Sequence, residues 1–340
     1  MKLIKVTQNE AGQRLDKLLA KYLNKAPKSF LYKMLRKKNI TLNGRKAAGN
    51  EKTEVGDEIR LFLSDETVDS FTENIKAVDE AKAVKMDGMP EIIYEDGHIV
   101  LINKPAGMLS QKAAASDVSL VEYLISYLLR KGDITEETLK SFRPSVCNRL
   151  DRNTSGIVAA GKSLPALQIM AEVFKDRSIH KDYLTLVWGH IDGTRKIQGY
   201  LKKDKARNQV VISSRMSEGA LPISTEYTPV CESQKVTLLK VRLITGRSHQ
   251  IRAHLASVGH PILGDAKYGD AVQNLTLKKA AGVTHQLLHS YRLQMPSDLP
   301  GPLGYLSGKT FYAAPPENFC RAAGSFGIKI DQSMFGEDGI

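Results

Sequence analysis

Residues 147–163 read CNRLDRNTSGIVAAGKS and place one carboxylate between two guanidinium groups, ahead of an apolar run. Arg149 and Arg152 flank Asp151, and nearby cations keep a carboxyl group in its charged form. Such an acid can serve as a nucleophile or base, or it can belong to an ordinary structural ion pair. The residues alone leave both interpretations open, and structural ion pairs are the more frequent of the two.

The second half of this stretch, 156–163, matches the letters of the phosphate-binding P-loop, G-x-x-x-x-G-K-S. A P-loop needs backbone N–H groups that point at phosphate, whereas the segment IVAA at 157–160 favours a β-strand. We find no apolar run that leads into Gly156 as a P-loop strand would. We therefore predict a strand here and keep a P-loop NTPase only as an alternative.

Composition limits the class of protein. The chain has 340 residues, of which 42% are hydrophobic, and this suits two domains with a substantial core. No run approaches the roughly 20 apolar residues that span a bilayer, so we expect no membrane partner. Three separated cysteines favour a reducing cytoplasm, and neither they nor the histidines form a metal-binding pattern. The formal charge of +12 predicts a polyanionic partner.

The basic excess is concentrated near the N-terminus. Residues 13–46 contain eleven Lys or Arg against one acid, a net charge of +10. Apolar residues at helical spacing predict two short helices within 15–35, and the turn Asn43-Gly44 predicts a hairpin after them. So much charge in a small unit favours electrostatic docking over a merely solvated surface. The acidic stretch that follows, 65–88, is predicted to be an extended linker.

The rest of the chain mixes strands and helices irregularly. We expect a hairpin at 91–103, helices at 120–129, 164–175 and 247–258, and strands at 183–188 and 235–244. This order indicates an α+β domain rather than regular βαβ winding. From residue 318 onward the sequence lacks periodicity, and we expect this end to be loose.

Several long stretches, taken together and in order, resemble the pseudouridine synthases of the RluA type. They are NRLDRNTSGIV, KDYLTLVWG, TGRSHQIRAHL, GHPILGDAKYG and LLHSYRL, within about residues 91–315. Near the N-terminus, RLDKLLAKYL, ITLNGRK and VGDEIRL resemble the S-four-like RNA-binding domain. The resemblance implies a small α/β RNA-binding domain at 1–64, the acidic linker at 65–88 and a C-terminal tail at 326–340. Between them, residues 89–325 would form a catalytic domain around a central, largely antiparallel mixed sheet.

By position, the same resemblance implies a set of functional residues. Asp151 would be the catalytic acid, Arg252 its ion-pair partner, and Tyr183 the residue beside the target base. Arg149 matches the arginine associated with base flipping, and Leu288, or its neighbour Leu287, would help form the pocket. The remaining candidates for substrate binding are Asn148, Arg152, Lys104 and Arg247, with Asn148 standing where many relatives have His.

The resemblance also implies the reaction and the partner. Members with this N-terminal domain typically modify large-subunit ribosomal RNA, so we expect an isomerase that flips a uridine and rejoins its base to ribose through carbon. Such a reaction needs no metal, nucleotide or redox cofactor. We expect a cytoplasmic monomer that acts on ribosomal RNA, free or within a pre-ribosomal particle. The alternative is a non-catalytic RNA-binding or ribosome-assembly factor on the same fold.

Overall fold

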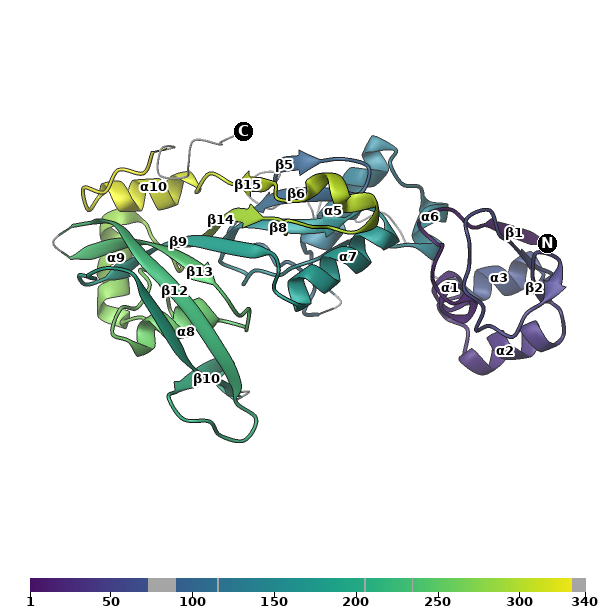
Figure 1. The fold of residues 1–340 in the computed structure, drawn as a ribbon, viewed down its shortest axis with the longest axis horizontal. Helices are drawn as coiled ribbons and strands as arrows, with labels where there is room; N and C mark the ends of the chain where they lie inside the picture. The colour runs from purple at the N-terminus through teal and green to yellow at the C-terminus, as the bar shows by residue number, and fades with distance from the viewer. Residues whose placement is uncertain (73–89, 115, 205, 234, 332–340) are drawn as a thin grey trace.

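The computed structural model describes residues 1–72, 90–114, 116–204, 206–233 and 235–331. They form an elongated molecule with a small N-terminal unit at one end and a larger unit around a long sheet (Figure 1). Each unit has its own hydrophobic core. None of the helices in these ranges is long and apolar enough to cross a membrane.

The N-terminal unit packs helices against a four-stranded sheet. The sheet has the order β1 (Lys2–Lys5), β4 (Glu58–Leu61), β2 (Ile40–Leu42) and β3 (Arg45–Lys46). The two predicted helices are α1 (Leu15–Tyr22) and α2 (Lys28–Arg36), and their apolar stripes are buried in the core. Asn43 and Gly44 both have positive φ, as a two-residue hairpin turn between β2 and β3 requires.

The stretch predicted to be an extended linker begins instead with a helix, α3 (Asp65–Phe71). Ser64 caps this helix, and two acids occupy its first turn, where the helix dipole favours negative charge. Val68 is buried, and the ring of Phe71 lies 4.5 Å from that of Phe30. The helix therefore packs with the N-terminal unit, which extends beyond residue 64. The rest of the predicted linker, 73–88, lies outside the described residues.

The two units meet at α6 (Glu136–Ser141) of the larger unit, which lies against α1 (Figure 1). The Tyr22 hydroxyl donates to a Glu137 carboxylate oxygen at 2.7 Å, and the Ser141 hydroxyl donates to Glu10 at 2.7 Å. Both bonds join residues more than 100 positions apart, so they fix the small unit against the large one.

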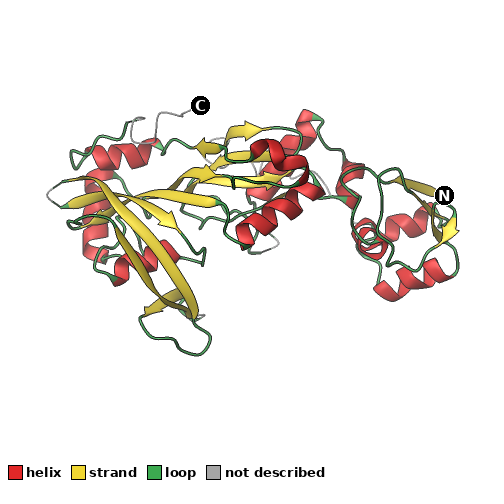
Figure 2. Cartoon of the chain, in the orientation of Figure 1, coloured by secondary structure: helices red, strands yellow, loops and turns green. Residues whose placement is uncertain are grey.

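The larger unit is built on one eleven-stranded sheet (Figure 2). Its main order is β11-β10-β12-β13-β9-β14-β8-β6-β5, with β15 beside β14 and β7 beside β8. Among the described residues, all pairings in this sheet are antiparallel except that of β8 with β14, which confirms the prediction of a largely antiparallel mixed sheet. The strands are β5 (Glu91–Glu95), β6 (Ile99–Lys104), β7 (Ser145–Val146), β8 (Ser155–Gly161), β9 (His180–Trp188), β10 (Arg195–Asp204), β11 (Gln209–Ser213), β12 (Leu221–Glu232), β13 (Val236–Leu243), β14 (Leu288–Gln294) and β15 (Thr310–Tyr312).

Helices cover both faces of the sheet centre. Alternate side chains of β6 and β8 point to opposite faces, so Val100 and Val158 enter the core beneath α5 (Leu120–Lys131), whereas Leu101 and Ile157 enter the core beneath α7 (Leu164–Lys175). Both helices lie where their sequence patterns predict. The remaining helices are α8 (Gln250–Ser257), α9 (Ala271–Ala281), the 3₁₀ helix η1 (Gly301–Leu306) and α10 (Glu317–Gly324).

The P-loop letters at 156–163 belong to β8 and the residues after it. The backbone of 156–161 pairs with β6, so its N–H groups face a neighbouring strand rather than a ligand. The Lys162 ammonium group contacts Glu95 at 2.8 Å and Asp133 at 2.5 Å. The strand prediction is confirmed, and the segment does not have the geometry of a phosphate loop.

The C-terminal part is more ordered than its sequence suggests. The sequence from residue 318 onward lacks periodicity, yet it lies largely in α10, which buries Phe319 against the outer part of the sheet. Phe326 then meets the Trp188 ring edge-on at 6.0 Å, and Ile328 is buried. Part of the predicted tail therefore packs on the larger unit. Residues 332–340 lie outside the described residues.

Candidate active site

Asp151 lies in the loop between β7 and β8, at the wall of a cavity of about 1350 Å³. The cavity brings together segments that are far apart in the chain: the Asp151 loop, the start of β9, the start of β14 and the entry to α8. Among the residues predicted from sequence, those on its wall are Asn148, Arg149, Asp151, Arg152, Tyr183, Arg247, Arg252 and Leu288.

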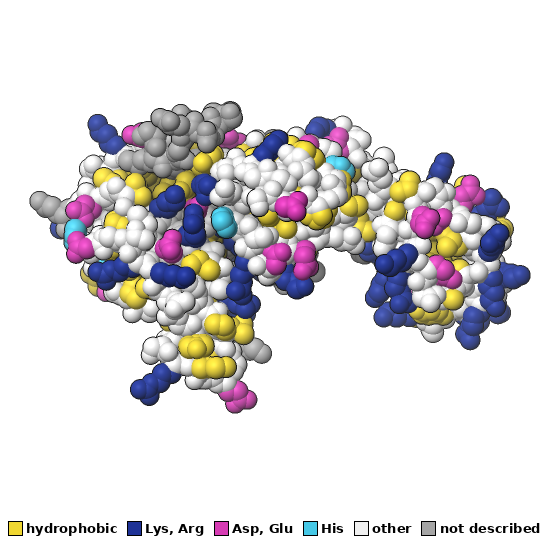
Figure 3. Space-filling view, in the orientation of Figure 1, with side chains coloured by type: hydrophobic (Ala, Val, Ile, Leu, Met, Phe, Trp, Pro, Cys, Tyr) yellow, Lys and Arg dark blue, Asp and Glu magenta, His cyan; other side chains and the backbone are white. Residues whose placement is uncertain are grey.

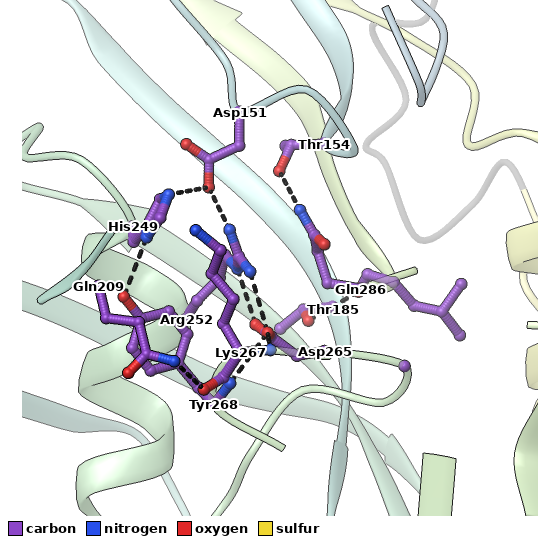
Figure 4. A network of polar contacts seen from close by, with 12 residues as sticks. Asp151, Thr154, Thr185, Gln209, His249, Arg252, Asp265, Lys267, Tyr268 and Gln286 are labelled. Carbon is purple, nitrogen blue, oxygen red and sulfur yellow. Dashed lines mark hydrogen bonds and ion pairs between the residues drawn. The ribbon is translucent and has the colours of Figure 1, made fainter. Parts of the chain in front are cut away.

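The predicted ion pair of Asp151 with Arg252 is present, and a second carboxylate completes it (Figure 4). Arg252 Nη1 donates to Asp151 Oδ2 at 2.8 Å. On its other edge, Arg252 donates to both oxygens of Asp265, from Nε at 2.7 Å and from Nη2 at 2.9 Å. Asp265 is fully buried, whereas a quarter of the Asp151 side chain is exposed. Arg252 therefore joins one structural carboxylate to one that faces the cavity.

The charge of Arg252 is secured by these partners. Burial disfavours a charged guanidinium, but the bonds and charges of Asp265 and Asp151 outweigh burial and raise the pKa of Arg252 further above its usual range. The Tyr268 ring lies 5.3 Å from the guanidinium and adds a cation–π contact. A permanently charged arginine therefore lies beside Asp151 at the cavity wall.

Tyr183 projects from β9, paired with Val241 of β13 and Ser290 of β14. Only 4% of the residue is exposed, yet it contributes to the cavity wall. Burial raises the pKa of Tyr183, and the Asp151 charge adds to this effect. The phenol therefore stays protonated at neutral pH.

The other predicted residues differ in what they offer a ligand. Arg149 and Arg152 are exposed on either side of Asp151, and Leu288 adds an apolar patch to the wall. Arg247 has a buried Nε with no hydrogen-bond partner among the described residues. Asn148 reaches the wall, but both ends of its amide bond the backbone of β8 at Ile157 and Ala159, so its polar atoms hold the loop to the strand.

Lys104, predicted to bind substrate, is fully buried and does not line the cavity. Its ammonium group donates to the carbonyl oxygens of Pro105 and Met108 at 2.9 Å and of Arg152 at 3.1 Å. Burial lowers the pKa of Lys104 to about 7, although the nearby Asp151 charge opposes this shift. Lys104 therefore fastens the loop after β6 to the residue that follows Asp151, which corrects the prediction of direct substrate contact.

Three residues of this network escaped sequence analysis as functional candidates: Asp265, His249 and Tyr268. His249 lies at the entry to α8, with its Nε2 4.0 Å from Asp151 Oδ2 and its Nδ1 2.9 Å from the Tyr268 hydroxyl (Figure 4). Asp265 and Tyr268 belong to the motif GDAKYG quoted above, but nothing in this motif predicts that they contact Arg252.

The histidine pair His285 and His289 does not hold a metal-like arrangement. His289 is buried, with Ser155 at Nδ1 and the Ala313 carbonyl accepting from Nε2, and burial lowers its pKa to about 4. In the part of the chain that the structure describes, no three His, Cys, Asp or Glu side chains gather as metal ligands would. His289 is therefore a hydrogen-bonded residue of the core.

Comparison with known proteins gives a consistent result. A family model described as RNA pseudouridylate synthase matches residues 98–257, a range that contains Asp151, Tyr183 and Arg252. The ribosomal large subunit pseudouridine synthase C of Escherichia coli (strain K12) is 30% identical over 307 residues, covering 86% of this chain and 88% of the relative. The protein of the same name from Vibrio cholerae serotype O1 is 31% identical over 276 residues, covering 79% and 81%.

A solved structure, Human RNA Pseudouridylate Synthase Domain Containing 4, has the same fold. Its TM-score is 0.56 at 21% identity, and the match covers 74% of this chain and 97% of that one. The larger unit therefore has the pseudouridylate synthase fold. The sequence match to the curated relatives covers most of the chain. The chain belongs to the RluA-type RNA pseudouridylate synthases.

Proposed function

We propose that this protein converts uridine to pseudouridine in large-subunit ribosomal RNA, with Asp151 as the catalytic residue. The observation that carries the proposal is the meeting of Asp151, Tyr183 and Arg252 in one cavity, although they lie on three separate segments. A carboxylate paired with a buried arginine, beside a protonated phenol, suits chemistry at a nucleoside. The ribosomal RNA substrate is supported by the names of the curated relatives.

The reaction is an isomerisation. The bond between N1 of uracil and C1′ of ribose breaks, and a bond between C5 and C1′ forms. C5 loses a proton and N1 gains one, so atoms and electrons balance without a co-reactant. Asp151 supplies the carboxylate for this exchange, as nucleophile or base, and Arg252 holds it through the 2.8 Å hydrogen bond. Tyr183 lies where its ring can hold the detached base.

The target uridine must leave its stack to reach this chemistry, at a cost of about a few kcal/mol. The cavity of about 1350 Å³ has room for a nucleotide and parts of its neighbours. Arg149, exposed beside Asp151, is placed to hold the RNA open once the base has turned inward. Arg152 on the other side can contact phosphate.

The N-terminal unit is proposed to be the S-four-like RNA-docking domain. Its α2 exposes Lys28, Lys33 and Arg36, and two more lysines follow at the end of the helix. Lys and Arg side chains gather over this unit in the space-filling view (Figure 3). Such a surface binds phosphates without reading sequence, so it would hold the RNA while the larger unit selects the uridine.

The test is Asp151→Asn, compared with Asp192→Asn, which changes an exposed acid outside the cavity. Pseudouridine formed in large-subunit ribosomal RNA is mapped chemically, and RNA binding is measured in parallel. Asp151→Asn should slow turnover by about 10³-fold or more without loss of RNA binding. Wild-type turnover by this variant would show that Asp151 is not catalytic, and binding without turnover by the wild type would favour a non-catalytic assembly factor.

The form of the substrate is part of the proposal. We propose that the protein acts as a monomer, on ribosomal RNA that is free or still within a pre-ribosomal particle. Protein-free large-subunit RNA, assembly intermediates and transfer RNA are offered to the enzyme in separate reactions. Modification of transfer RNA alone would refute the assignment to ribosomal RNA.

A further inference from the structure

His249 has a backbone conformation that its residue type does not favour. It has φ 54° and ψ 15° at the entry to α8, in the left-handed region that suits Gly and Asn. A histidine in this conformation costs about 1–2 kcal/mol. Backbone strain of this kind is found mostly at functional sites, where it fixes the orientation of a side chain. The ring lines the same cavity as Asp151 and is partly buried.

The hydrogen bonds around Tyr268 determine which ring nitrogen of His249 carries the proton. The backbone N–H of Val210 donates to the Tyr268 oxygen at 2.9 Å. His249 Nδ1 lies 2.9 Å from the Tyr268 hydroxyl oxygen, and we assign the hydroxyl hydrogen to this contact because the oxygen already accepts from Val210. Because Nδ1 accepts, the neutral ring has its hydrogen on Nε2. This is the nitrogen that faces Asp151.

Burial is the main reason that the His249 ring is neutral. Burial lowers the pKa of His249, and the cations Arg252 and Lys267 add to this effect, against the opposing carboxylates Asp151 and Asp265. At neutral pH the ring is therefore an uncharged N–H donor. A second cation at this place would weaken Asp151 as a nucleophile or base, because positive charge draws electron density from the reacting oxygens. A neutral donor orients the carboxylate with less of that penalty.

Both neighbours of the Asp151 carboxylate lie on one of its oxygens. Arg252 Nη1 and His249 Nε2 face Oδ2, at 2.8 Å and 4.0 Å, while Oδ1 has no hydrogen-bond partner among the described residues (Figure 4). The longer distance exceeds a hydrogen bond in the free protein, and catalytic contacts of this kind shorten when substrate binds.

We propose that His249 is a positioning residue, whose Nε2–H, set by Tyr268, donates to Asp151 Oδ2 in the substrate complex and leaves Oδ1 to react. The proposal rests on the proposed function, because it assigns the two oxygens of the catalytic carboxylate. It adds a residue that acts through Asp151 without touching the target base.

Two substitutions at His249 distinguish loss of the hydrogen-bond donor to Asp151 from a mere change in side-chain size. His249→Asn keeps the left-handed backbone and an acceptor near the position of Nδ1, but it has no atom at the position of Nε2. His249→Gln can extend an amide N–H to that position. His249→Asn should lower the single-turnover rate by about 10- to 100-fold with unchanged RNA affinity and melting temperature, and His249→Gln should restore most of the loss. A His249→Asn enzyme that turns over at the wild-type rate, or two variants that are equally slow, would overturn the proposal.

A measurement without turnover completes the test. In protein labelled with ¹⁵N-histidine, the NMR signals of His249 are assigned by their loss in the His249→Asn variant, or in the His249→Gln variant if the first does not fold. At pH 7 these signals should show a ring with its hydrogen on Nε2. Tyr268→Phe removes the hydroxyl and should weaken that preference, with a fall in rate similar to that of His249→Asn. An Nδ1–H ring or an imidazolium in the wild type refutes the tautomer assignment. The spectrum does not depend on Asp151 chemistry, so failure of this inference is distinct from full activity of Asp151→Asn.

Discussion

Replacing Asp265 with Asn tests how the charge of buried Arg252 is balanced. Asp265 is fully buried and accepts four hydrogen bonds: two from Arg252, at 2.7 and 2.9 Å, and two from the backbone N–H groups of Lys267 and Tyr268, at 2.8 and 3.1 Å. Asn has the same shape, but it has no charge and turns one acceptor into a donor. Arg252 would then rely on Asp151 alone.

The size of the effect follows from burial. Removing one partner from a buried ion pair costs about 3–5 kcal/mol. Since Asp151 still neutralises part of the Arg252 charge, we expect the lower end, about 3 kcal/mol of unfolding free energy. Asp151→Asn should cost less than about 1 kcal/mol, because Asp151 is a quarter exposed and Arg252 keeps its pair with Asp265.

Equilibrium unfolding in urea at pH 7 measures both variants. Trp188, the single tryptophan, lies at the end of β9 against the outer core and reports on the larger unit by fluorescence. We expect Asp265 to matter more for stability and Asp151 to matter more for turnover. Equal losses of stability in the two variants, or a loss below about 1 kcal/mol for Asp265→Asn, would refute this division.

Three further outcomes are expected. Gly156→Ala should cost about 3 kcal/mol or more in thermal unfolding, because φ is 112° and a Cβ would lie 2.2 Å from the Ser290 carbonyl oxygen; Gly132→Ala, with open space, should cost about 1 kcal/mol. Burial raises the pKa of Glu95, but hydrogen bonds from lysine and tyrosine side chains outweigh burial and lower the pKa to about 2. The charged Glu95 therefore stabilises the folded protein fully above its unfolded pKa, and this stabilisation is lost as the pH falls toward 2. Glu95→Gln should make the unfolding free energy depend less steeply on pH in that range. Changing Lys33 and Arg36 of α2, together with Lys37 just after it, to Ala should reduce the salt slope of RNA binding by up to about 3, and an unchanged slope would remove α2 from the interface.

The sequence predicts long, strongly patterned elements well. The helices α5 and α7 have continuous apolar stripes, and β9 is apolar over most of its length, so their positions follow from periodicity. The short helices α3 and α10 were missed because one or two turns carry too little pattern, and their stability comes from packing against a core formed by distant residues. Strand β10 was missed because most of its residues are exposed or half-buried, and half of them are charged.

The candidate site also contains residues that could be predicted from the sequence and residues that could not. Asp151, Tyr183 and Arg252 could be identified because they stand in long motifs that resemble a known family. The role of Lys104 could not, since its partners are backbone carbonyls, which every residue has. The role of Asp265 could not be predicted either, because only the tertiary fold brings its carboxylate to Arg252, on the side away from Asp151.

The hydrogen bonds on both sides of Asp151 suit the two roles proposed for this loop, in RNA binding and in chemistry. The backbone on either side of Asp151 is fixed: Ser110 bonds both the N–H and the carbonyl of Leu150, while Lys104 and the Gly107 N–H bond the carbonyl of Arg152. The acid is therefore held before substrate arrives, and little reorganisation is left for the reaction step. The arginine side chains beside it remain exposed and free to follow the RNA backbone. On the proposed function, a rigid carboxylate between two adaptable cations would let the enzyme open different RNA surroundings without moving the group that reacts.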